Sequence, residues 1–98
     1  MAFAVEVVIP GLTKSQYDEL RAKVGWLDTP PDGGMAHVAW WDGEDCHGVD
    51  VWESEAAFAA FAENRLGPGM AAIGVTADVV PVFHPAHEVF LPKALTLT

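Results

Sequence analysis

The chain has few basic residues and a single cysteine, and each shortage excludes a class of protein. Only five lysines and arginines stand against fourteen acidic residues, which gives a net charge of −9. Such a charge repels phosphate backbones and anionic membranes at long range, so neither nucleic acid nor a membrane is an expected partner. Cys46 alone cannot form an intrachain disulfide or a cysteine-based zinc site, and a reducing cytoplasm fits this use of cysteine.

Long apolar runs and signature motifs are missing as well. No stretch approaches the roughly 20 apolar residues that cross a bilayer, and the N-terminus lacks the basic flank and cleavage signature of a signal peptide. The sequence contains no G-x-S-x-G motif, phosphate loop or dinucleotide fingerprint. Nucleophilic hydrolysis and nucleotide chemistry therefore have no support.

Apolar side chains are abundant for so short a chain. Hydrophobic residues make up 51% of the 98 residues, with four tryptophans and five phenylalanines among them. A single domain of this length has a small core, and large exposed apolar patches are uncommon on soluble monomers. The excess is expected to line a ligand pocket or to cover a subunit interface, and we predict a homodimer.

Local patterns predict a strand followed by a helix at the start of the chain. Residues 3–9 are rich in valine and isoleucine and largely apolar on both faces, as in a strand covered on both sides. Thr13 and Gln16 have the spacing of a capping box, so a helix is expected to begin at Lys14. Gly25 is placed to end that helix.

The middle of the chain predicts a hairpin. The glycines and prolines of residues 26–34 indicate a loop. Residues 35–41 and 46–53 then read as two strands, joined by the acidic turn 42–45.

A second helix should follow directly from the last strand of that hairpin. Ser54 is a good N-cap, and Phe58 and Phe61 recur at helical spacing. The Gly-Pro-Gly of residues 67–69 is expected to break this helix, with one more turn opening at the proline and ending at Gly74.

The last expected strand is residues 78–83, and Pro81 assigns it to a sheet edge because proline lacks an amide donor. The apolar tail, 84–98, is expected to pack on the body of the protein or on a partner subunit. We therefore predict one domain over residues 1–98.

The order of these elements is that of a ferredoxin-like α+β sandwich, in which two helices cover one face of a four-stranded antiparallel sheet. Residues 37–70, and VDVWES within them, resemble the small antibiotic-biosynthesis-monooxygenase-like proteins of actinobacteria. The chain as a whole looks like their dimeric α+β barrel superfamily. The resemblance implies a dimer of stacked sheets and a hydrophobic cavity between each sheet and its helices.

That superfamily implies several functions rather than one. It includes cofactor-independent monooxygenases, polyketide cyclases, lactone isomerases, and proteins that bind or degrade heme. Heme-degrading members tend to present a histidine on the second helix, and no histidine lies between Ser54 and Leu66. Heme is therefore a minor alternative.

The candidate catalytic residues are His37, Asp50 and Glu6. If Trp41 faces Cys46 across the hairpin turn, His37 lies opposite Asp50 on the same face. A carboxylate beside an imidazole fixes its tautomer and raises its basicity. Glu6, on the neighbouring strand, is expected to join the pair. The alternatives are a buried polar pair without catalysis, and a Glu6 that faces solvent or pairs across the dimer.

Other residues are candidates for binding a ligand. The four tryptophans, Trp26, Trp40, Trp41 and Trp52, could form flat walls for an aromatic molecule, and core packing explains them equally well. Of these, Trp41 and Trp52 are the predicted substrate-binding residues, together with Phe58. His84 and His87 are candidates to orient a ligand at the open end of the cavity, or else surface residues. A metal site would need further ligands, for which His37, His47 and Glu88 are the obvious additions, and we expect no metal.

These residues favour a small enzyme that acts on a hydrophobic, aromatic or polyketide-like molecule without a dissociable cofactor. His37, oriented by Asp50, would move a proton in a cyclisation, an isomerisation or an enolate-forming oxygenation. The alternative is a non-catalytic small-molecule or heme-binding accessory protein of the same fold. A cavity of several hundred cubic ångströms that His37 reaches would favour the enzyme.

Overall fold

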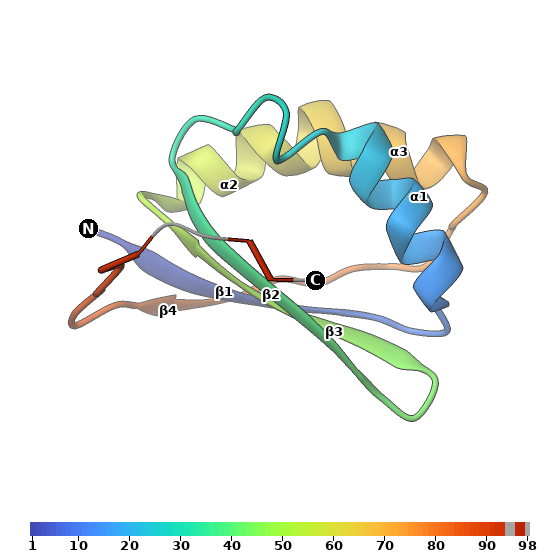
Figure 1. Cartoon of the computed structure of the whole chain (residues 1–98), viewed down its shortest axis with the longest axis horizontal. Coiled ribbons are helices and arrows are strands. Elements are labelled where there is room, and N and C mark those ends of the chain that lie inside the picture. Colours follow the sequence, from blue (N-terminus) through green and yellow to red (C-terminus); the bar gives the residue numbers. More distant parts are fainter. Residues whose placement is uncertain (94–95, 98) are drawn as a thin grey trace.

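The computed structural model describes residues 1–93, 96 and 97, and its elements follow the expected order. They are β1 (Phe3–Ile9), α1 (Lys14–Val24), β2 (Gly34–Asp42), β3 (Asp45–Trp52), α2 (Glu55–Phe61), a π-helical segment η1 (Ala62–Leu66), α3 (Gly67–Ala72) and β4 (Val82–Pro85). The sheet has the strand order β2-β3-β1-β4, with every neighbouring pair antiparallel. The helices lie together over one face of the sheet (Figure 1). The chain therefore has the ferredoxin-like α+β fold.

Helix α1 begins and ends where the local signals place it. The Thr13 side chain accepts the backbone N–H of Gln16 at 3.1 Å, and the Gln16 side chain accepts the backbone N–H of Thr13 at 2.9 Å. At the other end, Gly25 adopts a left-handed conformation with φ 68° and donates its N–H to the carbonyl of Arg21. Both ends are thus satisfied without a tertiary partner.

The hairpin has the predicted register. Trp41 pairs with Cys46 and His37 with Asp50, after an irregularity between Gly34 and Ala36. Because side chains alternate between the two faces of a strand, His37, Trp41 and Asp50 share the face under the helices.

The second helix runs further than expected. Instead of breaking at residues 67–69, the chain continues from α2 through η1 into α3. Pro68 has no N–H, and its ring would collide with the carbonyl of the fourth preceding residue of a regular helix. The wider π turn just before it, in which the N–H of Gly67 reaches the carbonyl of Ala62, accommodates the proline in the first turn of α3. Gly74 then takes a positive φ of 75°, beyond the end of the helix at Ala72.

The predicted bounds of the last strand, 78–83, were wrong. Strand β4 covers Val82–Pro85 and pairs with residues 3–6 of β1. It begins directly after Pro81, which cannot donate a hydrogen bond to the neighbouring strand. The strand does lie at the sheet edge, as Pro81 indicated. The expected packing of the tail falls in part on residues 94, 95 and 98, which lie outside the described residues.

The core fills the space between the helices and the sheet. Its most buried large side chains are Val5, Leu12 and Trp52, all with exposed fractions of 1% or less. A Cβ added at Gly69 would lie 3.1 Å from Leu20 Cδ1, so the glycine lets α3 approach α1 closely. The other buried hydrophobic residues are Ile9, Leu20, Val24, Cys46, Phe58, Phe61 and Met70.

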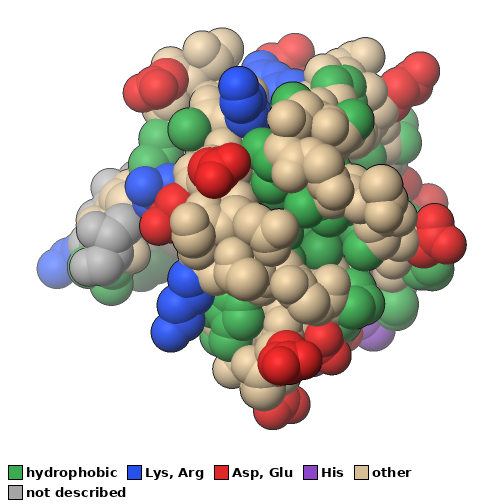
Figure 2. Space-filling view, turned by 90° about the vertical axis from the view of Figure 1, so that its right-hand side faces the viewer, with side chains coloured by type: hydrophobic (Ala, Val, Ile, Leu, Met, Phe, Trp, Pro, Cys, Tyr) green, Lys and Arg blue, Asp and Glu red, His purple; other side chains and the backbone are tan. Residues whose placement is uncertain are grey.

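The opposite face of the sheet has no helix over it. The β2 side chains of Val38 and Trp40 are 59% and 43% exposed, and Val82 on β4 is 51% exposed. A view of another side of the molecule shows acidic side chains around the periphery and hydrophobic side chains gathered between them (Figure 2). Across the described ranges, the structure contains no helix with the length and apolar character needed to cross a membrane.

Candidate functional site

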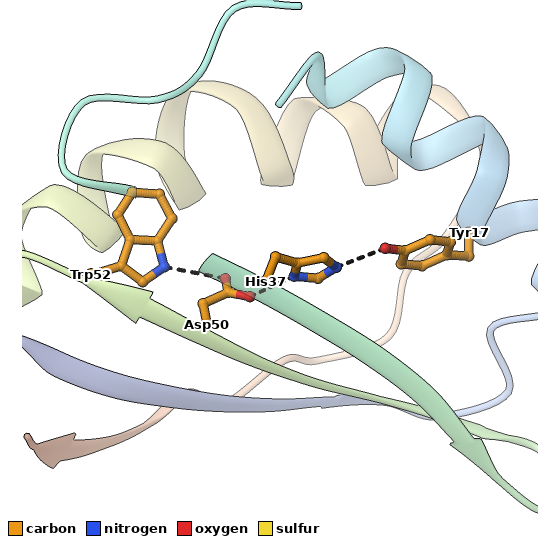
Figure 3. A network of polar contacts seen from close by, with 4 residues as sticks. All are labelled: Tyr17, His37, Asp50 and Trp52. Carbon is orange, nitrogen blue, oxygen red and sulfur yellow. Dashed lines mark hydrogen bonds and ion pairs between the residues drawn. The ribbon is translucent and has the colours of Figure 1, made fainter. Parts of the chain in front are cut away.

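Four side chains under the helices form a continuous chain of hydrogen bonds (Figure 3). The hydroxyl of Tyr17, from α1, lies 2.7 Å from Nε2 of His37 on β2. The other ring nitrogen of His37, Nδ1, lies 2.5 Å from Oδ1 of Asp50 on β3. Trp52, also on β3, donates its indole N–H to the second oxygen of Asp50 at 3.2 Å.

Asp50 is the buried member of this chain, with 5% of its surface exposed. A carboxylate removed from water costs several kcal/mol unless its oxygens are hydrogen-bonded. Here one oxygen accepts from His37 and the other from Trp52. Within the described part of the chain, every buried side-chain nitrogen and oxygen atom has a hydrogen-bond partner.

The position of Asp50 selects the tautomer of a neutral His37. Because the carboxylate only accepts hydrogen bonds, Nδ1 of His37 carries the proton that it donates to Asp50. Nε2 then has a free lone pair, which accepts a hydrogen bond from the hydroxyl of Tyr17. A ring nitrogen held in this way is a proton acceptor directed toward α1.

Tyr17 is held in its protonated form. Burial raises the pKa of its hydroxyl above the ordinary value of about 10, and the nearby Cys46 and Asp50 raise this pKa further while Arg21 opposes them. The side chain therefore acts as a hydrogen-bond donor at neutral pH.

An open cavity of about 810 Å³ lies beside this chain of hydrogen bonds, and Tyr17, His37 and Asp50 line it. Gly48 helps to keep it open, because a Cβ at that position would lie 3.2 Å from Val7 Cγ2 and 3.9 Å from His37 Cε1. The rest of the wall is mainly apolar and includes four aromatic residues, namely Trp26, Trp41, Phe58 and Phe61.

Trp41 and Phe58 line the cavity, and Trp52 does not. The Trp52 side chain is fully buried, with its ring 5.2 Å from that of Trp26 and 5.0 Å from that of Phe61. It packs behind the aromatic wall residues and donates a hydrogen bond to Asp50. Trp52 is therefore placed to hold the carboxylate, rather than to contact a ligand.

Glu6 does not join the His37 and Asp50 pair. It lies on the open face of the sheet, where its Oε1 is 2.6 Å from Nε2 of His84. Its neighbour in β1, Val5, pairs with Asp50 and points to the helix side, so alternation sends Glu6 to the other side. Neither His84 nor His87 lines the cavity.

One residue of the site, Tyr17, was not among the predicted ligand-binding residues, whereas Trp26 was one of the tryptophans predicted as possible walls for a ligand. Tyr17 carried a signal that could have found it, because a buried phenol requires a polar partner. No group of three or more histidine, cysteine or acidic side chains that could hold a metal occurs in residues 1–93, 96 and 97.

Comparisons with known proteins match the fold rather than the sequence. No protein-family model and no curated protein matches this chain. Among solved structures, SnoaB, a cofactor-independent oxygenase from Streptomyces nogalater, is 14% identical with a TM-score of 0.63, over 94% of this chain and 97% of SnoaB. A putative antibiotic biosynthesis monooxygenase from Nitrosomonas europaea is 10% identical with a TM-score of 0.66, over 88% and 90% of the two chains.

A third match is a dimeric ferredoxin-like protein of unknown function from Thermobifida fusca. It is 17% identical with a TM-score of 0.60, over 88% of this chain and 92% of the other. At these identities the likeness shows the fold, which this chain shares with antibiotic-biosynthesis-monooxygenase-like proteins. The expected restriction to actinobacteria does not hold, since Nitrosomonas europaea lies outside that group.

Proposed function

We propose that this chain, which has the fold of antibiotic-biosynthesis-monooxygenase-like proteins, is a small enzyme that removes a proton from a hydrophobic, aromatic or polyketide-like molecule without a dissociable cofactor. The observation that carries the proposal is the chain of hydrogen bonds from Tyr17 through His37 to Asp50 on the wall of an aromatic cavity. The cavity volume falls in the range of small-molecule sites, roughly 300–1,000 Å³. The structural match to SnoaB, a cofactor-independent oxygenase, supports the proposal.

The base in this mechanism is Nε2 of His37. A substrate carbon next to a carbonyl, or conjugated with one, loses its proton to Nε2, and the electron pair of the broken C–H bond is delocalised onto the carbonyl oxygen. Asp50 stabilises the imidazolium that forms, through the short hydrogen bond to Nδ1. The substrate displaces the Tyr17 hydroxyl from Nε2. This hydroxyl, still protonated, then donates a hydrogen bond to the enolate oxygen.

The fate of the enolate determines the reaction type. It can attack a second carbonyl of the same molecule in a cyclisation, or accept the proton back at another carbon in an isomerisation. In an oxygenation it reduces dioxygen, which is the oxidant. All three reactions begin with the proton transfer to His37, so one test serves them together.

The enzyme is proposed to be a homodimer in which two sheets pack through their open faces. The exposed Val38, Trp40 and Val82 give that face its apolar character. The dimeric ferredoxin-like neighbour from Thermobifida fusca supports this arrangement. A reducing cytoplasm is the proposed compartment, because the chain has one cysteine and it is a buried free thiol.

The test is exchange of a substrate proton for solvent deuterium. The probe is a tricyclic anthrone, a carbon acid whose methylene C–H is acidified by a ketone conjugated with it through the flanking aromatic rings. It is incubated with protein in deuterium oxide and followed by mass spectrometry. His37→Ala should abolish the protein-dependent exchange, and Asp50→Asn should reduce it by about 10²–10⁴-fold. His87→Ala is the matched control, because that exposed histidine lies outside the cavity lining.

The same experiment identifies the alternatives. Equal exchange in wild type and His37→Ala would refute the mechanism. Probe binding without exchange would favour a non-catalytic small-molecule carrier, and a Soret band after addition of hemin would favour a heme-binding protein.

A further inference from the structure

Two basic side chains lie in the lining of the cavity. Lys14 and Arg21 are two of only five basic residues in a chain with fourteen acidic ones, and both line the cavity. The carboxylates in the same lining are Asp18 and Asp50. Positive and negative side chains are therefore balanced at the cavity, although the chain as a whole is strongly acidic.

These cations stand at the rim of the cavity. Tyr17 and Asp18 lie three and four residues after Lys14 and four and three residues before Arg21, which places the four side chains on one face of α1. Lys14 and Arg21 are exposed, whereas Tyr17 is half-buried and reaches down to His37. A ligand whose reactive carbon lies at His37 would thus extend past Tyr17 to the two cations.

Packing of α1 does not account for Lys14. It is the first residue of the helix, where the positive end of the helix dipole disfavours a cation, and no acidic residue lies in the first turn. Its ammonium group lies 5.7 Å from the centre of the Trp41 ring, on the cavity wall. Arg21, in the last turn, has the position that the dipole favours.

Neither cation has a carboxylate partner among the described residues. The ion pairs among the described residues involve only histidines, so no carboxylate of these residues lies within 4.0 Å of the charged nitrogens of Lys14 or Arg21. Asp50 is already engaged by His37 and Trp52. Both cations are available to a ligand.

We propose that Lys14 and Arg21 bind an acidic group of the substrate, so that the substrate is an aromatic or polyketide-like monocarboxylic acid with its rings in the cavity and its carboxylate at the rim. This inference rests on the proposed function for the ligand being a substrate. Lys14, Arg21 and Asp18 together carry one net positive charge, which suits a monoanion. At physiological salt the Debye length is about 8 Å, so the repulsion of the ligand by acidic residues farther away than this on the surface is largely screened.

The test compares two probes that differ only in charge. Anthraquinone-2-carboxylate and anthraquinone-2-carboxamide are titrated into the full chain, with quenching of tryptophan fluorescence as the signal, since Trp26 and Trp41 line the cavity. Wild type should bind the carboxylate about tenfold more tightly than the carboxamide. Lys14→Gln and Arg21→Gln should each weaken carboxylate binding by about three- to fivefold and leave carboxamide binding within twofold.

Two further variants test whether position or total charge matters. Lys23→Gln removes a cation from the same helix, and that residue lines a separate surface depression rather than the cavity. It should leave the preference for the carboxylate unchanged. Asp18→Asn removes the one carboxylate of the rim stripe and should tighten carboxylate binding.

Equal affinity for the two probes in wild type would refute the inference, as would a loss in Lys23→Gln as large as that in Lys14→Gln. Catalysis is judged separately by deuterium exchange. A preference for the carboxylate without exchange dependent on His37 would retain the binding site and overturn the proposed function. Exchange dependent on His37, without any charge preference, would retain the function and overturn the anionic substrate.

Discussion

Asp50→Asn should change which nitrogen of His37 carries the proton. The aspartate accepts two hydrogen bonds, from Nδ1 of His37 and from the indole of Trp52. An asparagine offers one accepting oxygen and one donating nitrogen, so it cannot accept from both neighbours. If its oxygen keeps the Trp52 bond, its nitrogen donates to Nδ1, and the proton of His37 moves to Nε2. The lone pair that is proposed to take the proton of a substrate is then lost.

The cost in stability should be modest compared with the loss of activity. A hydrogen bond to a charged group contributes about 1.5–3 kcal/mol, and a neutral one about 0.5–1.5 kcal/mol. Exchanging one for the other at Asp50 should lower the free energy of unfolding by roughly 1–2 kcal/mol, because the Trp52 bond remains. For a domain of this size that corresponds to a fall in Tm of about 5–15 °C. Proton transfer to His37 should fall by about 10²–10⁴-fold.

Nitrogen-15 NMR of the imidazole measures the tautomer directly, without any substrate. At pH 8 the wild type should show a protonated Nδ1, and Asp50→Asn a protonated Nε2. Urea unfolding at one fixed protein concentration gives the accompanying stability change, with His87→Ala as a surface control. A protonated Nδ1 in both proteins would refute the role assigned to the carboxylate.

Three further predictions concern groups around the site. Burial should raise the pKa of Tyr17, the single tyrosine, above its ordinary value of about 10. Because the tyrosine of the unfolded chain ionises at lower pH, the free energy of unfolding should fall as the pH rises past 10. An ultraviolet titration that matches that of the unfolded chain would contradict this. Burial also raises the pKa of the Cys46 thiol, so iodoacetamide at pH 8 should alkylate it at least about tenfold more slowly in the native than in the urea-unfolded protein, and equal rates would be inconsistent with that burial. Gly33→Ala should lower the free energy of unfolding by about 2–4 kcal/mol, because φ is 80° there and the new Cβ would lie 2.6 Å from Ala57 Cβ. Gly43→Ala is the control, since φ is 63° but the space around it is open, and it should cost about 1 kcal/mol. Equal losses in urea unfolding would show that the contact with Ala57 does not matter.

The elements that local signals define were predicted to within a residue or two. The capping box at Thr13 and the glycine at Gly25 fix the ends of α1 through bonds made within the helix itself. The short turn between β2 and β3 likewise determines the pairing of His37 with Asp50. The central pair of the site followed from that register.

The parts that depend on distant contacts were not predicted. The helix continues through Pro68 because a π turn absorbs the missing hydrogen bond and because Gly69 packs against Leu20 of α1, and neither effect is visible in the local pattern. The hydrogen bond from Tyr17 to His37 joins α1 to β2 and requires the packing of that helix over the sheet. The local pattern places Tyr17 in the first helix but does not show which strand that helix packs on.

The error over Glu6 follows from treating neighbouring strands as one site without assigning faces. Val5 pairs with Asp50 across β1 and β3, so the odd-numbered residues at that end of β1 face the helices and Glu6 faces the opposite side. The sheet thereby separates two pairs of the same composition, His37 with Asp50 over the cavity and His84 with Glu6 on the open face. The first pair is part-buried and linked to Tyr17 and Trp52, whereas both partners of the second are more than half exposed. A water-accessible pair contributes little to stability. The proposed proton transfer is therefore assigned to the face under the helices, and the proposed dimer contact to the open face.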